Sequence, residues 1–367
     1  MSKVKLCDVC VKQSSKYAQK DLNDLHGEYP VFGASGFIKN ISEYHQENDY
    51  VAVVKDGAGI GRTMFLPGKS SVIGTLQYLL PKKNVLPKYL YYAVRSMHLE
   101  KYYTGATIPH IYFKDYQKEE FNLPELSEQK NVVFILEKLE KVISYRKRQL
   151  ESLDKLVKSR FVEMFGDVST NNYKCEISKL RDVANIGSSH RVLITDFVEE
   201  GIPFYRGTEI GELASGVKPK EPYFISEEHY NRIANDKTKP QIGDLLLPSI
   251  CNKGQVWMVD TSEPFYYKDG RVLCISPNRE IFVSKYLEYY MRAKTLVEYA
   301  KLGSGSTFAE FKIFLLKDID VLIPPRELQE QFADFAQQVD KLKFEVTRES
   351  EKVQILYDSL LQKYFNE

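Results

Sequence analysis

The stretch KLCDVCVKQSS, from Lys5 to Ser15, returns in the middle of the chain as KLRDVANIGSS, from Lys179 to Ser189. Six of the eleven positions are identical, all in the one register that aligns Lys5 with Lys179. A match of this length in a fixed register indicates an internal repeat, in which one structural unit occurs twice. We therefore expect two related halves within the 367 residues, a length that suits two domains and their connections.

Two further pairs of stretches occur in the same order. PKYLYYAVRS, from Pro87, matches SKYLEYYMRA, from Ser284. LPELSEQ, from Leu123, matches IPPRELQEQ, from Ile323, with a two-residue slip in its second half. Three collinear matches predict a duplication of the whole unit. The two stretches of the second pair lie farther apart in the sequence than the two stretches of the first pair. This difference predicts that the second copy of the unit is the longer one.

Each copy ends in a long stretch without proline or glycine, from Ser127 to about Phe165 and from Glu330 to about Tyr364. Apolar residues recur in both stretches in alternating steps of four and three, the heptad pattern of a coiled coil. They are Val132, Leu136, Leu139, Ile143, Leu150, Leu153, Val157 and Met164, and then Phe332, Phe335, Val339, Leu342, Val346, Val353, Leu356 and Leu360. We expect two long helices that pair as an antiparallel coiled coil with pseudo-twofold symmetry. The alternative is that each helix packs only on its own domain.

The segments before the two helices combine short β-rich runs with closely spaced turns. In the first segment, the run from Tyr50 to Lys55 and the run from Thr75 to Leu80 flank a glycine-rich stretch, DGAGIGR, from Asp56 to Arg62. Such runs, followed by a helix that bears the KYL motif, predict α/β (mixed α+β) domains with a curved sheet. The predicted boundaries are 1–124 for the first domain, 125–166 for the first helix, 167–324 for the second domain and 325–367 for the second helix.

The sequence shows no familiar catalytic or metal-binding motif. DGAGIGR lacks the Gly-Lys-Ser/Thr of a nucleotide-binding loop, so we interpret it as a hairpin turn that needs positive φ angles. Cys7 and Cys10 form a CxxC without a second pair at metal spacing, and the repeat has Arg181 and Ala184 in their places. The six histidines do not cluster, and five scattered cysteines argue against a disulfide framework. We therefore expect no catalytic residue and no metal site.

Composition and charge narrow the class of protein further. Hydrophobic residues make up 43% and charged residues 28%, as in ordinary globular proteins. No apolar run approaches the ~18 residues of a membrane helix, and the first residues lack a signal-peptide pattern, so we expect a cytoplasmic protein. The net charge is only +1, although a protein that holds DNA by itself is usually more basic. Either the chain does not bind nucleic acid, or partner proteins supply much of the positive charge.

The order of domains and helices, with the strings YPVFGASG, IPFYRGTEIG, HYNRI, LPELSEQK, IPPRELQEQ and LESLDKLVKSRF, resembles the specificity subunit of type I restriction-modification enzymes. The resemblance covers nearly the whole chain. It implies two target recognition domains, each reading half of a split, asymmetric site in double-stranded DNA, joined by paired spacer helices. It also implies partners, namely two modification (methyltransferase) subunits and restriction subunits. S-adenosylmethionine, ATP and Mg²⁺ would belong to these partners, with no cofactor and no catalytic residue in this chain.

Reading of bases requires polar or cationic side chains on loops that reach the base edges in a groove. In the first domain the candidates are Ser14, Ser15, Lys16, Ser35, Lys39, Lys55, Arg62, Thr107 and His110. In the second domain they are Ser188, Ser189, His190, Arg191, Arg206, Thr208, Lys253, Lys268, Arg271, Ser304 and Ser306. Because the Ser-Ser pairs recur in both domains, we expect them to support structure or contact phosphates rather than choose bases. The tyrosines of the KYL motifs are interpreted as core residues rather than as stacking platforms.

Three other functions fit parts of the sequence. A related system, in which one partner chain both methylates and cleaves, would use the same kind of recognition subunit. The duplicated domains could instead bind protein as a scaffold, and the DNA affinity of the assembled complex separates this function from DNA recognition. An unrecognised nuclease is the third alternative, although the sequence has no convincing set of carboxylates for it.

Overall fold

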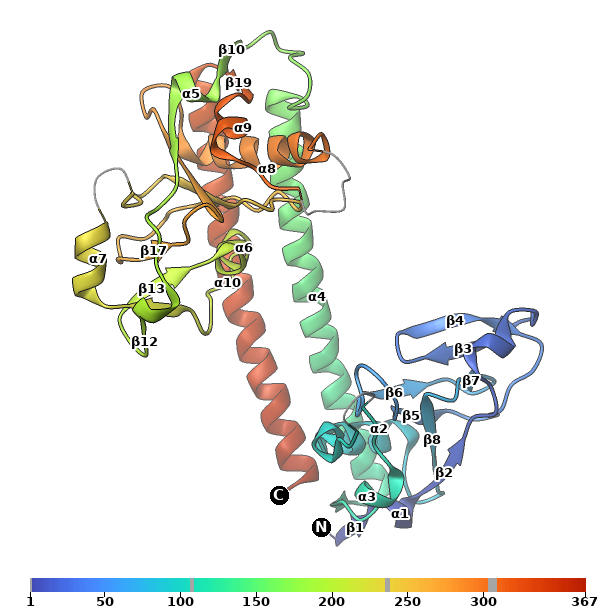
Figure 1. The fold of residues 1–367 in the computed structure, drawn as a ribbon. Helices are drawn as coiled ribbons and strands as arrows, with labels where there is room; N and C mark the ends of the chain where they lie inside the picture. The colour runs from blue at the N-terminus through green and yellow to red at the C-terminus, as the bar shows by residue number, and fades with distance from the viewer. Residues whose placement is uncertain (1, 106–108, 235–237, 303–308) are drawn as a thin grey trace. The chain divides into compact units, whose positions relative to one another are not determined.

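The computed structural model describes residues 2–105, 109–234, 238–302 and 309–367. It divides into two compact units, of which unit 1 comprises Met1–Gln149 with Val346–Glu367 and unit 2 comprises Leu150–Glu345. Each unit contains one α/β block and one part of each long helix (Figure 1). The long helices are thus shared between the units, and the boundaries of the four predicted segments stay a prediction.

In unit 1 the block opens with a short β-pair and builds two further sheets. Strand β1 (Ser2–Lys5) pairs antiparallel with β9 (Glu120–Leu123), which closes the block just before the long helix. The main sheet has the order β2-β8-β5-β6, and the second sheet has the order β4-β3-β7. Their strands are β2 (Cys10–Ser14), β3 (Tyr29–Gly33), β4 (Gly36–Ile41), β5 (Tyr50–Val54), β6 (Thr63–Leu66), β7 (Ser71–Val72) and β8 (Leu76–Pro81). The helices are α1 (Leu6–Val9), η1 (Gln19–Leu22), α2 (Pro87–Ser96), η2 (Leu99–Tyr102) and α3 (Phe113–Tyr116).

The central strand β5 explains why this block folds around its main sheet. Its sequence YVAVV is apolar and rich in β-branched residues, and all five side chains are fully buried. Val51 and Val53 pack in a cluster with α2 and the long helices, whereas Tyr50, Ala52 and Val54 pack in a second cluster with residues of the smaller sheet. The alternation of side chains along a strand therefore divides the core into two layers.

Unit 2 repeats the main sheet and the terminal β-pair, which confirms the predicted duplication, although its second sheet has four strands instead of three. The sheet β11-β18-β15-β16 corresponds to β2-β8-β5-β6, and a parallel pair, β13–β17, corresponds to β3–β7. The strands are β10 (Glu176–Lys179), β11 (Ala184–Gly187), β12 (Phe197–Val198), β13 (Ile202–Tyr205), β14 (Tyr223–Ile225), β15 (Leu245–Pro248), β16 (Trp257–Met258), β17 (Tyr266–Tyr267), β18 (Val272–Pro277) and β19 (Asp320–Ile323). The helices that have counterparts in unit 1 are α5 (Leu180–Val183), α8 (Ser284–Ala300) and α9 (Ile313–Lys317).

The second block is longer because it contains additional helices, as the spacing of the repeated motifs predicted. Helices α6 (Gly207–Ala214) and α7 (Glu227–Ile233), with the short η3 (Ile194–Asp196), stand between β11 and β15. In unit 1 the corresponding segment, residues 15–49, is described throughout and contains only η1 as a helix. The two blocks therefore share a scaffold but differ in what surrounds the second sheet.

The two long helices have equal lengths and begin at equivalent positions. Helix α4 spans Leu126–Phe165 and helix α10 spans Arg326–Phe365, 40 residues each. Gln129 and Gln329, in their first turns, are both fully buried. Each accepts a hydrogen bond, at 2.9 Å in both units, from the backbone N–H of the residue just before the KYL helix. The register that aligns Leu123 with Ile323 therefore continues into the helices, and the predicted two-residue slip is wrong.

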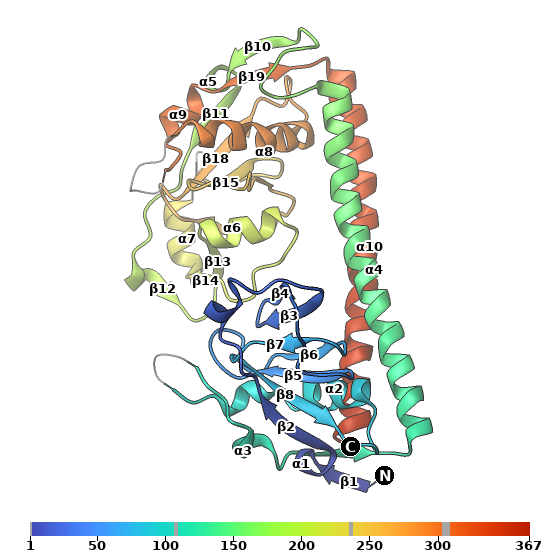
Figure 2. The ribbon, with the colours of Figure 1, turned by 90° about the vertical axis from the view of Figure 1, so that its right-hand side faces the viewer.

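Within each unit the two long helices run in opposite directions, as predicted (Figure 2). In unit 1, Val132 and Leu136 near the start of α4 share a core cluster with Tyr357, Leu361 and Phe365 near the end of α10. In unit 2 the matching cluster joins the end of α4 to the start of α10 and contains Val157, Phe161, Phe165, Phe332, Ala336 and Val339. Both clusters also include residues of the α/β block, so each helix packs on its partner and on a block at the same time.

Part of the predicted heptad stripe is wrong. Leu342 and Leu356 belong to it but are 50% and 48% exposed, whereas Phe161 and Tyr357 lie outside it and are buried. A strict repeat of 3.5 residues drifts around a straight helix by ~20° per heptad. Because each helix also covers an α/β block, the buried face is broader than a coiled-coil seam and includes positions that the repeat does not mark.

The KYL motifs attach each block to a long helix, and their tyrosines are core residues, as predicted. Tyr89 of α2 and Tyr286 of α8 are fully buried, and each hydroxyl donates to a carbonyl of the strand that precedes the long helix. The ion pairs between a KYL helix and a long helix include Arg95–Glu140 in unit 1 and Lys285–Asp340 in unit 2, both at 2.7 Å. The repeated motif therefore has a structural purpose, which is to fix a block on its helix.

Candidate nucleic-acid interface

One edge of the main sheet in unit 1 gathers most of the candidates of the first domain. Strands β2 and β5 end at this edge, and β8 and β6 begin there. Ser14 therefore lies opposite Gln77, and the N–H of Lys55 donates to the carbonyl of Thr75 at 3.0 Å. Strand pairing within the sheet thus places residues from distant parts of the sequence side by side.

The glycine-rich stretch at this edge is a hairpin turn between β5 and β6, as predicted. Gly57, Gly59 and Gly61 have φ angles of 86°, 89° and 79°, which side chains rarely adopt. A Cβ on Gly61 would lie 2.6 Å from the backbone nitrogen of Glu100 in η2. The glycines therefore allow a tight turn that passes close to the neighbouring helix. This turn explains their presence without a phosphate-binding loop.

A charged cluster stands at the same edge. Asp56 accepts a hydrogen bond from Lys55 at 2.8 Å, and its other oxygen lies 2.7 Å from Nδ1 of His110. Burial by itself would raise the pKa of Asp56, but the hydrogen bonds from Lys55 and His110, and their charges, bring it below its ordinary value. The carboxylate therefore stays ionised and holds both candidate side chains in place.

Two further candidates of unit 1 meet at the turn between β3 and β4. Nη1 of Arg62 donates to the carbonyl of Ala34 at 3.0 Å, which brings the exposed Arg62 next to the exposed Ser35. Lys39 is placed differently, because its Nζ donates to the two carbonyls at the end of η1, at 2.8 and 3.2 Å. Its ammonium group therefore secures η1 against β4.

The recurring serines contact the backbone in both blocks. Ser15 donates to the carbonyl of Val72 in β7, and Ser189 donates to the carbonyl of Tyr267 in β17. Ser188 donates to β18 at 2.8 Å, whereas Ser14 is exposed. The bonds of Ser15, Ser188 and Ser189 tie the end of β2 or β11 to the rest of the block, whereas Ser14 takes no part in them.

The equivalent edge in unit 2 lies where β11 and β15 end and β18 begins. Lys268 and Arg271 stand in the turn before β18, where the carbonyl of Lys268 accepts the N–H of Val272 at 3.0 Å. The N–H of Ser249, directly after β15, donates to the carbonyl of Arg271 at 2.8 Å. The loop that carries Lys253 therefore starts at this edge as well.

Arg206 and Thr208 stand at the start of α6, close to the same edge. A Cβ on Gly207 between them would lie 3.2 Å from the Cβ of Pro248, the last residue of β15. Arg206 forms an ion pair with the buried Glu209, with Nη2 and Oε1 2.6 Å apart. Burial would raise the pKa of Glu209, but hydrogen bonds from the side chain and backbone of Arg206 lower it. The guanidinium group is therefore held in one orientation.

The remaining candidates are exposed or undescribed. Lys16 follows the end of β2 and is exposed, and so are His190 and Arg191 after the end of β11. The N–H of His190 donates to the hydroxyl of Tyr266 at 2.9 Å, which holds the start of this segment. Thr107, Ser304 and Ser306 lie outside the described residues.

The structure adds acidic residues to both edges that the sequence reasoning missed. Glu310 pairs with Arg271 and, at 2.8 Å, with Lys312. Glu310 occupies the position that His110 has in unit 1. The N–H of Ile111, directly after His110, donates to the carbonyl of Lys55, directly after β5, at 2.9 Å. In the same way the N–H of Phe311, directly after Glu310, donates to the carbonyl of Ser249, directly after β15, at 2.7 Å. An alignment of the two halves that matches Gln129 with Gln329 also matches the candidate His110 with Glu310, and it would have marked Glu310 as a candidate. Nothing in the sequence indicated that Asp56 contacts His110.

The two cysteines of the CxxC motif are placed differently. The buried Sγ of Cys10 donates to the carbonyl of Leu6 at 3.2 Å, whereas Cys7 is half-buried. In the described part of the chain, no group of three or more His, Cys, Asp or Glu side chains is positioned to hold a metal ion. In the same residues, no helix is long and apolar enough to cross a membrane.

Cys7 is expected to react with iodoacetamide at pH 8 well before Cys10. Burial raises the pKa of Cys10 to about 12, so only ~0.01% of it is thiolate at pH 8, and the thiolate is the reactive form. Peptide mass spectrometry after timed labelling would measure both rates. Equal rates in the folded protein would contradict this placement, and labelling in urea provides the control.

The fold defines a protein with two similar, non-identical α/β blocks on paired helices. The family model of the type I restriction modification DNA specificity domain matches residues 1–155 and 172–356. The chain belongs to this family of specificity subunits.

Individual relatives agree with this assignment. The type I restriction enzyme MjaVIII specificity subunit of Methanocaldococcus jannaschii is 26% identical over 90% of this chain and 83% of that protein. A putative type I restriction enzyme specificity subunit of Haemophilus influenzae is 22% identical over 88% of this chain and 83% of its own length. Among solved structures, the S subunit of a type I restriction-modification system from M. genitalium has the same fold. Its TM-score is 0.60 at 15% identity, with 100% of this chain and 96% of that chain covered.

Proposed function

We propose that this chain is the non-catalytic subunit that selects the DNA target of a type I restriction-modification complex. Each α/β block reads one half of a split, asymmetric site in double-stranded DNA with the edge of its main sheet. The observation that carries this proposal is that two blocks of one topology present different side chains at the same edge. One edge carries Asp56 with His110, and the other carries Arg271 with Glu310. Two readers of different chemistry imply two different half-sites.

The paired helices are proposed to set the distance between the half-sites and to dock two methyltransferase subunits, which restriction subunits then join. Val142 and Leu342, at equivalent positions of α4 and α10, are 37% and 50% exposed. Leu156 and Leu356, also equivalent, are both 48% exposed. Exposed apolar residues in a heptad-like arrangement are typical of surfaces that a partner covers. Their occurrence at matching positions supports two copies of the same partner.

The partners are proposed to supply the chemistry and part of the positive charge. S-adenosylmethionine, ATP and Mg²⁺ would be bound by the methyltransferase and restriction subunits, while this chain contributes recognition alone. A net charge of +1 is low for a protein that binds DNA by itself. A duplex held between this chain and its methyltransferases would meet phosphate contacts from both.

Long-read methylome sequencing of the host, with and without this gene, tests the proposed function. Loss of adenine methylation at one split motif is expected, and the motif gives both half-sites and their spacing. An unchanged methylome, together with failure of the chain to co-purify with a methyltransferase, would contradict the proposal. A complex that binds no DNA would leave a protein scaffold as the explanation.

Binding of the assembled complex to its motif is expected to depend more steeply on salt than binding of this chain alone, because each neutralised phosphate releases counterions.

Replacing Lys268 by alanine should weaken binding to all duplexes and reduce the salt slope by about one. Fluorescence anisotropy at several salt concentrations measures both quantities. The exposed Lys341 of α10 provides the control, since its replacement should leave the slope unchanged. Equal slopes for chain and complex would contradict the shared-charge explanation.

A further inference from the structure

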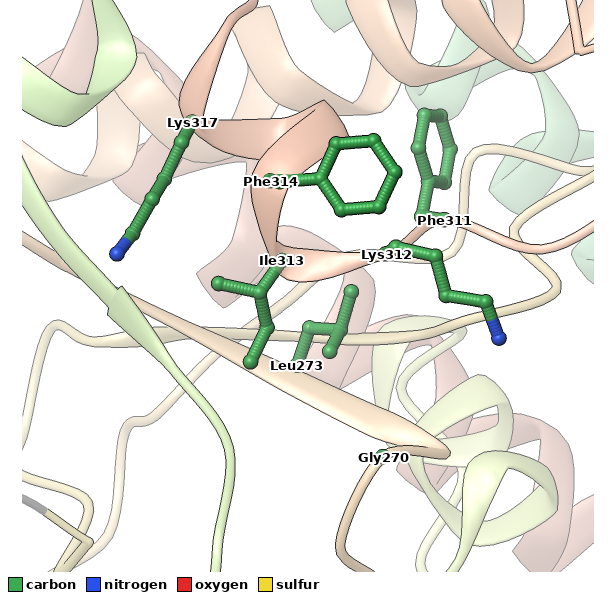
Figure 3. A pocket seen from close by; sticks show the side chains of 7 residues that line it. All are labelled: Gly270, Leu273, Phe311, Lys312, Ile313, Phe314 and Lys317. Atoms are coloured by element: carbon green, nitrogen blue, oxygen red, sulfur yellow. The ribbon is translucent and has the colours of Figure 1, made fainter.

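The edge of unit 2 contains an apolar pocket that the candidate residues do not explain. The pocket has a volume of about 390 Å³ and lies between the start of β18 and helix α9. Its lining consists of Gly270, Leu273, Phe311, Lys312, Ile313, Phe314 and Lys317 (Figure 3). Gly270 directly precedes Arg271, so the pocket opens beside the proposed DNA-binding edge.

Phe314 gives this pocket its character. Its side chain is 68% exposed, although it stands in a short helix that buries Leu316 completely. Figure 3 shows Ile313 and Leu273 close to one another below the Phe314 ring, so that the floor and one wall are hydrocarbon. A concave site that combines an exposed aromatic ring with aliphatic side chains favours a small apolar group.

The rim of the pocket is cationic, and this determines what kind of molecule carries the apolar group. Lys312 and Lys317 are exposed, and Figure 3 shows their ammonium ends extending to opposite sides. Lys312 is paired with Glu310 at 2.8 Å, whereas the ion pairs found among the described residues include none of Lys317, so the positive charge of Lys317 is the one left for a ligand. Exposed lysines around an apolar floor fit an apolar group on a polyanion. In the major groove of DNA, that group is the 5-methyl of thymine.

We propose that Phe314 and the pocket beneath it read the 5-methyl group of a thymine in the half-site bound by unit 2, while Lys317 contacts a neighbouring phosphate. This inference rests on the proposed function and adds a residue that selects a base by apolar contact rather than by hydrogen bonds.

Unit 1 shows that Phe314 is not part of the shared scaffold. In the register that aligns Gln129 with Gln329, its counterpart is Lys114, whose Nζ lies 5.3 Å from the centre of the Tyr112 ring. The corresponding helices α3 and α9 start at equivalent positions, so the backbone is common to both blocks. A cation in one block and an exposed phenylalanine in the other therefore mark a position where the two readers differ.

The test uses the assembled complex and a labelled duplex that carries the split motif found by methylome sequencing. Each thymine of the motif is replaced in turn by deoxyuridine, which lacks only the 5-methyl group. At one thymine of one half-site, the wild-type complex is expected to bind about four-fold more weakly after this replacement, the effect of one buried methyl group. The F314A variant should bind the normal duplex about four-fold more weakly and should no longer respond to deoxyuridine at that position. F314L, which restores apolar contact, should regain part of the response.

Two further variants separate this contact from general effects. I177A removes an exposed side chain from β10, outside the pocket, and should keep the full response to deoxyuridine. K317A should weaken binding to normal and substituted duplexes equally. Specific binding of the motif without a response at any thymine, or a response that F314A retains, would overturn the inference and leave the proposed function intact. A complex that does not prefer the motif over a scrambled duplex would overturn the proposed function itself.

Discussion

Replacing Phe161 by alanine is expected to lower the free energy of unfolding of unit 2 by about 3–5 kcal/mol, the usual cost of deleting a buried aromatic side chain. Phe161 is 4% exposed and joins three helices. Its ring centre lies 5.4 Å from that of Phe332 in α10, 5.9 Å from that of Tyr286 in α8 and 5.1 Å from that of Phe165 in its own helix. The cavity would therefore open where the long helices and the block meet.

Urea unfolding followed by tryptophan fluorescence measures this effect in unit 2 alone. The chain has a single tryptophan, Trp257, which is 6% exposed in strand β16 of unit 2. Val162, the next residue, is 56% exposed, and its replacement by alanine should change the free energy of unfolding by less than about 0.5 kcal/mol. A Phe161→Ala variant as stable as Val162→Ala would contradict the packing described for the two long helices.

Replacing Gln329 by alanine should cost unit 2 about 2–4 kcal/mol through lost hydrogen bonds rather than through lost apolar contact. The fully buried Gln329 accepts from the N–H of Val283 at 2.9 Å and donates to the carbonyls of Ile281 and Pro324 at 3.1 and 2.9 Å. Without this side chain, backbone groups at the starts of α8 and α10 lose their partners in a site that water reaches poorly.

The same fluorescence experiment measures the loss, and the chain offers two comparisons. Gln331 is exposed, so its replacement by alanine should be nearly neutral. Gln129 makes the equivalent bonds in unit 1, so Gln129→Ala should leave the tryptophan transition in place and lower the stability of unit 1, as seen by far-ultraviolet circular dichroism. A shift of the tryptophan transition by Gln129→Ala as large as that by Gln329→Ala would contradict the assignment of the two glutamines to separate units.

Much of the fold was predictable from the sequence because its main contacts occur twice. A contact that occurs in both copies requires the same side chains in both, so the buried tyrosines of the KYL motifs and the two glutamines recur at matching positions. The long helices were predictable for a second reason, since 40 residues without proline or glycine and with regular apolar spacing have few other stable structures. The β5–β6 hairpin was predictable because only glycine suits its positive φ angles.

The candidate site was less predictable because its members meet only after folding. Asp56 and His110 are 54 residues apart, and Arg271 and Glu310 are 39 residues apart. No local pattern marks such pairs, and the acidic partner was missed in each. Lys39 is a candidate by its charge, and the sequence did not indicate that its ammonium group donates to a carbonyl of η1. Phe314 lies in the apolar run IFLL, and nothing in the sequence indicates that its side chain is 68% exposed.

The duplication, the mixed α/β character of each block, the two long helices and their antiparallel pairing follow from the sequence alone. These features depend on repeated residues and on local periodicity, which a single sequence displays directly. The buried faces of the long helices, the charged residues that gather at each sheet edge and the exposure of Phe314 beside a pocket follow from the tertiary structure. These features depend on contacts between residues far apart in the chain, because the free energy of burying or pairing a side chain is set by neighbours that folding brings to it.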